Sequence, residues 1–131
     1  MGLNEEERST LVCLEMDKAD RAMSDAQTTA GIGLWETSAN RLYYAAFHAV
    51  SALLIHSQHP VGTHKGAVAQ FGRFFIQTGL ISPELGKHYS RLQSMRESGD
   101  YNCNMNVGED DVIPMIAPTI ELISDIKALI G

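Results

Sequence analysis

The sequence predicts an all-α fold, an up-and-down antiparallel bundle of four to five helices. Apolar residues recur at spacings of three and four through most of the chain, whereas no stretch alternates with the period of two that is typical of a half-buried strand. The helical stretches are joined by short segments containing Gly, Pro or Asn, which connect antiparallel neighbours. At 131 residues, we expect a single domain over residues 1–131.

The first helix is expected from Asn4 to about Ala30. Asn4 is a good N-cap, and three glutamates follow it in the first turn, where the helix dipole favours negative charge. The apolar face is narrow, so this helix is expected on the outside of the bundle. That face consists of Leu11, Cys13, Leu14 and Ala22.

The central helix is expected from Trp35 to His56. Two adjacent apolar stripes make a face too wide for a surface helix, so we expect it to be packed from several sides. The stripes are Trp35, Ala39, Leu42, Ala46, Ala49 and Leu53, and beside them Tyr43, Phe47, Val50 and Leu54. A third, polar stripe indicates either a buried hydrogen-bond network or the wall of a site. Its members are Thr37, Arg41, Tyr44, His48 and Ser51.

Three more helices follow. One begins at residue 63 or 64 and ends at 78, and the next begins at the Ser82 cap and Pro83 and runs to about 98, where Gly99 ends it. The last is capped by residue 110 or 111 and runs to about 130, and Pro118 predicts a kink or a later start. Isoleucines give this helix an apolar stripe that is core or dimer interface. They are Ile116, Ile120, Ile123, Ile126 and Ile130.

The composition limits the function. A net charge of −6 disfavours a broad, non-specific nucleic-acid binder but is compatible with a small local group of Arg and Lys. No apolar run reaches the roughly 18 residues that cross a bilayer, and the acidic N-terminus does not resemble a secretory signal. Cys13 and Cys103 lack CxxC spacing. We therefore expect a cytoplasmic protein with reduced thiols, no membrane association, no metal site and no cofactor.

Arg96 continues the buried stripe of the fourth predicted helix. The preceding members are Leu85, Tyr89 and Leu92. A guanidinium in line with core residues needs a partner or a wet pocket, because an unpaired buried charge costs several kcal/mol. Asp100 lies four residues further on and can pair with Arg96 if the last turn stays helical, and Tyr101 can offer a hydroxyl.

Five sequence blocks together resemble the HEPN-domain proteins, in particular a small stand-alone branch found in bacteria and archaea. The blocks are SANRLYYAAFHAVSALL at 38–54, THKG at 63–66, FGRFF at 71–75, TGLISPELG at 78–86 and RESGDY at 96–101. The resemblance covers about the whole chain from Leu11 onward, and the order and spacing of the blocks match.

The resemblance implies a helical bundle that commonly forms homodimers and is often encoded beside a minimal nucleotidyltransferase, as half of a toxin–antitoxin pair. Active family members are metal-independent ribonucleases whose late helix carries an Arg followed, after about four to six residues, by a His. Two copies of this motif form the RNA-cleaving site at the dimer interface. The Arg stabilises negative charge on the phosphate while the His moves the proton of the ribose hydroxyl.

This sequence departs from the motif at its second position. Arg96 matches the Arg, but Tyr101 stands where His is expected, and no His follows His88. A phenol with a pKa near 10 is a poor general base at neutral pH. Arg41 and His48 also have the Arg-to-His spacing, but they lie on the central helix, about 10 Å apart along its axis, and we interpret them as a chance match.

Some of these residues also have structural interpretations. Arg96 and Asp100 can form an ion pair that fixes a helix end, and His48 can be a satisfied interior histidine. The histidines around one turn lack a nearby carboxylate and are interpreted as solvated. They are His56, His59 and His64. Several aromatic residues are expected in the core. They are Tyr43, Phe47, Phe71, Phe74 and Phe75.

The leading hypothesis is a HEPN-like homodimeric module of a toxin–antitoxin pair that binds RNA, a nucleotide or a minimal nucleotidyltransferase partner without cleavage. The expected recognition groups are Arg96, Asp100 and Tyr101, with Arg41, Tyr44 and His48 lining the same groove. Two alternatives stay open. One is a metal-independent ribonuclease toxin acting at a dimer groove, with Tyr101 or His48 in place of the missing base, and the other is a purely structural dimerising adaptor. Enzymatic activity is therefore left open, with a binding role favoured.

Overall fold

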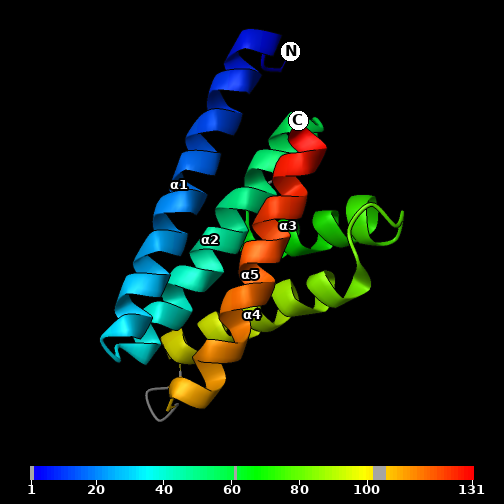
Figure 1. Ribbon diagram of the computed structural model, residues 1–131. Coiled ribbons are helices and arrows are strands. Elements are labelled where there is room, and N and C mark those ends of the chain that lie inside the picture. Colours follow the sequence, from blue (N-terminus) through cyan, green and yellow to red (C-terminus); the bar gives the residue numbers. More distant parts are fainter. Residues whose placement is uncertain (1, 61, 102–105) are drawn as a thin grey trace.

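A computed structural model describes residues 2–60, 62–101 and 106–131, with the backbone alone for 98–101. These parts of the chain form five α-helices, one π-helical segment and no strand, which confirms the predicted all-α helical bundle. The elements are α1 (Glu5–Gly31), α2 (Trp35–His56), α3 (His64–Phe71), η1 (Gly72–Ile76), α4 (Pro83–Tyr101) and α5 (Glu109–Ile130). In Figure 1, α1 and α5 lie along α2, whereas α3 and α4 are tilted away from these three helices.

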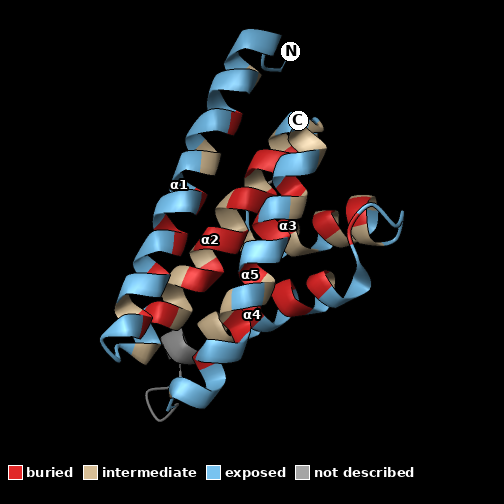
Figure 2. Ribbon diagram, viewed as in Figure 1, coloured by how far each residue is buried: buried red, intermediate tan, exposed pale blue. Residues whose placement is uncertain are grey.

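The central helix α2 has the predicted bounds and contacts α1, α3, α4 and α5. Its buried residues include members of both predicted stripes, and Figure 2 shows red, buried positions along most of its length. Leu42, Tyr43 and Leu53 are 1% exposed or less. The prediction of a helix packed from several sides is confirmed.

The first helix begins as predicted, because Asn4 Oδ1 accepts the Glu7 N–H at 2.8 Å and the Asn4 N–H is donated to Glu7 Oε1 at 2.9 Å. Its predicted apolar face is wrong except for Ala22, since Leu11 and Leu14 are 36% and 50% exposed and Cys13 is exposed. The buried face consists mainly of small residues: Val12, Ala19, Ala22, Met23, Ala26 and Ala30. Small side chains let two helix backbones approach closely, and Ser38 Oγ of α2 donates to the Ala26 carbonyl at 2.7 Å.

The third predicted helix is interrupted, because its α-helical part ends at Phe71 and η1 follows. Gly79, with φ of 81°, ends the following turn, in the left-handed region that glycine adopts readily. The π-helical segment packs closely against α4 at Gly86, where a Cβ would lie 2.9 Å from Ile76 Cδ1. A side chain at position 86 would therefore require the Ile76 side chain to shift.

The ends of α4 and α5 differ from the predictions. Ser82 Oγ accepts the Leu85 N–H at 3.3 Å, as expected of a cap, but α4 continues through Gly99 to Tyr101. A glycine with helical angles costs a helix only about 1 kcal/mol, so it does not force an end. Gly108, rather than an aspartate, occupies the N-cap position of α5, and its N–H is donated to Asp111 Oδ2 at 2.9 Å.

The last helix runs from Glu109 past Pro114 and Pro118, so the predicted alternative of a later start is wrong, whereas the alternative of a kink at Pro118 stays a prediction. The isoleucine stripe is only partly buried: Ile123 and Ile126 are in the core, whereas Ile120 is 43% exposed. The buried face is rotated toward other residues. It consists of Val112, Met115, Thr119, Leu122, Ile123 and Ile126. In the described part of the chain, no helix has the length and hydropathy needed to cross a membrane.

Candidate functional site

Two guanidinium groups from different helices lie over one tyrosine ring. Arg41 Cζ of α2 is 5.0 Å and Arg96 Cζ of α4 is 5.7 Å from the centroid of the Tyr44 ring. Both distances are within the range of cation–π attraction. The Arg41 group is also fixed by its neighbour, since its Nε and Nη2 donate to Asn40 Oδ1 at 3.1 and 2.7 Å. The contact between the Tyr44 ring of α2 and the Arg96 guanidinium of α4 therefore links these two helices.

Tyr43 extends this arrangement into the core. Its ring is fully buried, and Arg96 Cζ lies 5.6 Å from the ring centroid. Burial raises the pKa of the Tyr43 hydroxyl well above its usual value, although the positive charge of Arg96 opposes this effect. The hydroxyl hydrogen bonds to Nδ1 of His64, at the start of α3. Tyr43 thus connects α3 to the arginine of α4.

His64 is held by aromatic contacts as well. Its ring stacks on Phe47 with a centroid distance of 4.3 Å and meets the edge of Tyr44 at 6.0 Å. Thr63 precedes it and caps α3 by accepting the Gly66 N–H at 2.9 Å. The interpretation of His64 as a solvated loop residue is wrong, because His64 is the first residue of α3. His59 does lie in the turn after α2, where its ring stacks on Phe74 at 3.8 Å.

His48 lies beside the same tyrosine, with a centroid distance of 6.1 Å to Tyr44. Its Nδ1 is 2.6 Å from Glu15 Oε2 of α1, and both side chains are 21% exposed. A carboxylate on one ring nitrogen fixes the orientation of an imidazole and leaves the other nitrogen for a ligand or a proton.

We call this group the aromatic–arginine cluster. It consists of Arg41, Tyr43, Tyr44, Phe47, His48, His64 and Arg96. Tyr89 of α4 packs against it, and the buried Tyr89 hydroxyl oxygen has no hydrogen-bond partner among the described residues. Tyr89 stacks on Tyr43 at 6.4 Å.

The structure brings four of the six predicted site residues together: Arg41, Tyr44 and His48 from α2, and Arg96 from α4. The other two, Asp100 and Tyr101, fall where side chains are not described. The predicted site residues do not include Glu15, Tyr43, Phe47 or His64. Phe47 is one residue from His48, and Tyr43 is one from Tyr44, so the apolar stripe beside the polar one was the available signal for these two.

The cluster has the chemistry of a surface that recognises a phosphate and a flat ring. Guanidinium groups bind phosphate oxygens through paired N–H donors and stack on aromatic faces. Aromatic side chains stack on unpaired bases at about 1–3 kcal/mol for each base. The His48–Glu15 pair adds an imidazole that can accept or donate a proton. In the described residues, no group of three or more His, Cys, Asp or Glu side chains could hold a metal ion.

The fold, together with Arg96 on the late helix α4, defines a small helical-bundle domain of the HEPN type. The chain belongs to the HEPN family, because the HEPN domain model matches residues 14–129. A "UPF0332 protein" of Thermotoga maritima is 34% identical over 86% of this chain and 86% of its own length. A protein of Methanocaldococcus jannaschii named "Putative toxin MJ0605" is 27% identical over 82% of this chain and 80% of its own length. Another from that organism, "Putative toxin MJ0142", is 22% identical over 73% and 65%.

Proposed function

We propose that this chain is a HEPN module that binds RNA or a nucleotide through the aromatic–arginine cluster, without cleaving it. The observation that carries the proposal is the position of Arg41 and Arg96 on the Tyr44 ring. Two cations held beside aromatic rings provide a phosphate contact and a stacking surface within a protein whose net charge of −6 would otherwise repel RNA. The positive charge of the two arginines therefore favours RNA binding at this surface over the rest of the acidic protein.

The proposed setting is a toxin–antitoxin pair in the cytoplasm. The toxin names of two relatives support this setting, and HEPN domains often work as dimers. We further propose that the chain forms a homodimer and that its partner is a minimal nucleotidyltransferase. In a homodimer with the two α4 helices close together, two clusters would present four guanidinium groups to one RNA strand.

The proposal excludes cleavage because Tyr101 stands at the motif position of the catalytic histidine. A phenol stays protonated at neutral pH and is a weak general base. Asp100 and Tyr101 keep a proposed role in recognition next to Arg96, as a hydrogen-bond acceptor and donor for the ligand.

The test is binding of a fluorescent single-stranded RNA to the full chain, measured by anisotropy at several salt concentrations. Arg41→Gln and Arg96→Gln each should weaken binding about tenfold and reduce the salt dependence by about one phosphate contact. Arg73→Gln is the matched control, because Arg73 is exposed and lies over Phe74, outside the cluster. If all three variants bind RNA as the wild type does, the cluster is not the binding surface, and the adaptor role is the better explanation.

The His48–Glu15 pair favours one second candidate, a metal-independent ribonuclease in which His48 is the general base and Arg96 stabilises the phosphate. Cleavage of bulk RNA in the presence of EDTA tests it. Activity that is lost in both His48→Gln and Arg96→Gln, while RNA binding persists in His48→Gln, would replace the binding proposal by the enzyme. Intact RNA after prolonged incubation supports the binding role.

A further inference from the structure

A groove lies between α3 with η1 on one side and α4 on the other, and it shares no residue with the aromatic–arginine cluster. It has a volume of about 370 Å³. Its lining is mainly apolar, and Lys87 is the one charged side chain among the described residues that line it. The apolar residues with free surface are Val68, Ile76 and Pro83. Apolar surface that a protein leaves open in a groove is a common feature of binding sites.

Gly72 provides part of the free space. Its backbone is helical, with φ of −59° and ψ of −46°, and a Cβ at this position would meet no described atom within 4 Å. On the facing helix, Gly86 lets α4 approach the Ile76 side chain closely. A helical position normally favours a residue larger than glycine. The fold therefore accommodates a side chain at Gly72, and the sequence leaves that space open.

The groove lies in the longest part of the sequence without acidic residues. No Asp or Glu occurs between Glu36 and Glu84, and the rest of the chain contains all 16 of them. The helix α2, the helix α3 and the segment η1 fall within this part. In a protein with a net charge of −6, this region is positive relative to its surroundings.

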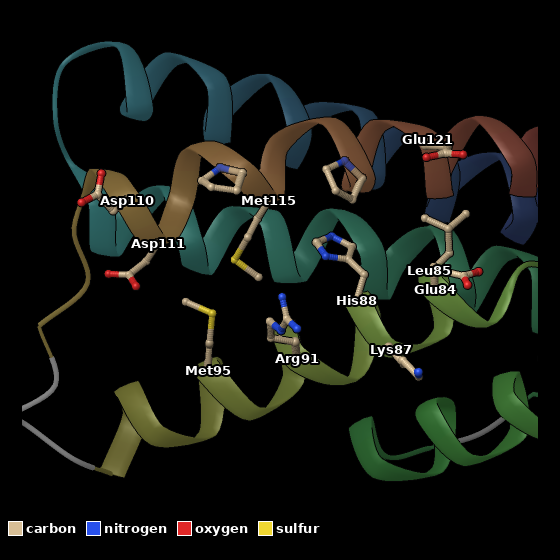
Figure 3. A pocket seen from close by; sticks show the side chains of 12 residues that line it. Glu84, Leu85, Lys87, His88, Arg91, Met95, Asp110, Asp111, Met115 and Glu121 are labelled. Atoms are coloured by element: carbon tan, nitrogen blue, oxygen red, sulfur yellow. The ribbon is translucent and has the colours of Figure 1, made fainter.

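Two lysines bring positive charge to the groove itself. Lys65 is exposed and precedes Val68 by three residues and Gly72 by seven, which places it on the helix face that lines the groove. On the opposite wall, Figure 3 shows the Lys87 side chain pointing from α4 toward α3, whereas Glu84 points away from α3. The groove therefore combines apolar walls with cations on both sides.

The lining does not suit a nucleic-acid base. Phe71 and Tyr89 line the groove, but they are 1% and 0% exposed, and their rings meet edge to face at 5.7 Å. Neither ring has an open face for base stacking, in contrast to the half-buried Tyr44 of the cluster. The free surface is aliphatic, so it matches aliphatic side chains with acidic neighbours.

The groove is long enough for two turns of a helix. Val68 and Ile76 are eight residues apart, which at 1.5 Å per residue is about 12 Å along the axis. Leu80 is 55% exposed and lies in the turn that joins η1 to α4, so it adds apolar surface at this end of the groove. Helices that bind in grooves use apolar residues at i, i+3 or i+4, and i+7, which span the same length.

We propose that this groove binds an amphipathic helix of a partner protein in which Asp or Glu flanks the apolar face. The apolar side chains of the partner fill the space at Gly72, and its carboxylates contact Lys65 and Lys87. Complementary charge increases the rate of association and disfavours basic partners. The proposal does not depend on RNA binding by the cluster.

The first test measures peptide binding to the full chain by fluorescence anisotropy. The probe is a labelled peptide of two Leu-Glu-Ala-Leu-Glu-Glu-Ala repeats. It should bind about tenfold more tightly than the same peptide with Lys for every Glu, and than the same peptide with Ser for every Leu. No binding of the acidic peptide, or equal binding of the acidic and basic peptides, would overturn the proposal.

A substitution at Gly72 locates the peptide. Gly72→Leu places a side chain in the groove and should weaken binding of the acidic peptide at least about tenfold, whereas the smaller Gly72→Ala should weaken it less. Leucine is the better helix former, so the midpoint of thermal unfolding should not fall. Equal affinity of wild type and a folded Gly72→Leu would place the peptide elsewhere.

Charge reversal is a second, independent measurement. Lys65→Glu and Lys87→Glu each should weaken binding of the acidic peptide about tenfold. Arg21→Glu is the matched control, because Arg21 is exposed on α1 and the change in net charge is the same. Equal effects of all three variants would mean that only the overall charge matters, and the proposed groove contact would be wrong.

Other occupants give different results. If Gly72→Leu dissociates a wild-type dimer in sedimentation velocity, the groove holds a second copy of this chain and the proposal fails. If decanoate binds and the acidic peptide does not, the groove takes a small amphiphile and the proposal also fails. RNA binding should be unchanged in Gly72→Leu, so this proposal and the RNA-binding proposal can fail separately.

Discussion

Glu15 Oε2 of α1 lies 2.6 Å from His48 Nδ1 of α2, and both side chains are 21% exposed. The Lys127–Asp20 pair between α5 and α1 has a similar distance of 2.9 Å, but its side chains are 47% and 51% exposed. Water screens charges at an exposed pair and reduces its contribution to stability. Of these two links to α1, the Glu15–His48 pair is therefore expected to contribute more to stability.

Removing each pair tests this difference. Glu15→Gln should lower the free energy of unfolding by about 1–2 kcal/mol, because it weakens a partly buried, charge-assisted hydrogen bond. Asp20→Asn should lower it by less than about 0.5 kcal/mol. Urea unfolding followed by circular dichroism at low and high salt measures both. Equal losses in the two variants would show that exposure does not distinguish the pairs.

Two buried tyrosines provide a matched comparison. Tyr43 and Tyr89 are both fully buried, but within the described residues only the Tyr43 hydroxyl has a hydrogen-bond partner, His64 Nδ1. Tyr43→Phe should cost about 1 kcal/mol of stability and increase hydrogen exchange at the start of α3. Tyr89→Phe removes a hydroxyl without a partner and should be neutral or stabilising. The reverse order of the two effects would contradict the assigned hydrogen bond.

His88 predicts a specific pH dependence of stability. Its pKa is about 4 in the folded chain and about 6.5 when unfolded, so below pH 6.5 the unfolded state binds a proton that the folded state refuses. Stability should therefore fall as the pH drops from about 6.5 to about 4, by about 3 kcal/mol in total, and level off below.

The matched variant for this titration is His88→Gln, which keeps a polar side chain but cannot titrate. The difference in the free energy of unfolding between wild type and variant isolates His88, because all carboxylates titrate in both proteins. The measurement is urea unfolding at intervals from pH 7 to pH 4. Two parallel curves would mean that His88 titrates in the fold as it does in water.

The sequence predicts the fold well where the signal is local. The apolar period of Trp35–His56 gives the bounds of α2, and Asn4 gives the start of α1, since both depend on residues within a few positions of each other. The predictions for the end of α4 and the N-cap of α5 were wrong because Gly99 and Gly108 are each compatible with two conformations. Tertiary packing, rather than local preference, decides between them.

The candidate site is predictable only in part for the same reason. Helical spacing places Arg41, Tyr44 and His48 on one face of α2. The buried stripe of the fourth predicted helix singles out Arg96, and the resemblance to HEPN proteins supports it. The partners of these residues come from remote parts of the chain: Glu15 is 33 residues from His48, and His64 is 21 residues from Tyr43. Neither pairing has a periodic signal, so only the three-dimensional structure shows it.

The interface between α1 and α2 illustrates how residue size misleads, and it yields a last prediction. Ala19 and Ala26 are fully buried, whereas the larger Leu14 is 50% exposed, because close helix packing selects small side chains. Ala19→Leu adds volume where no space exists and should cost about 1–3 kcal/mol. Leu14→Ala removes a large apolar side chain but should cost less than about 1 kcal/mol, since half of its surface is already in water. Thermal unfolding of the two variants measures the order. A larger loss for Leu14→Ala would mean that α1 turns its leucine face, and not its alanine face, toward the core.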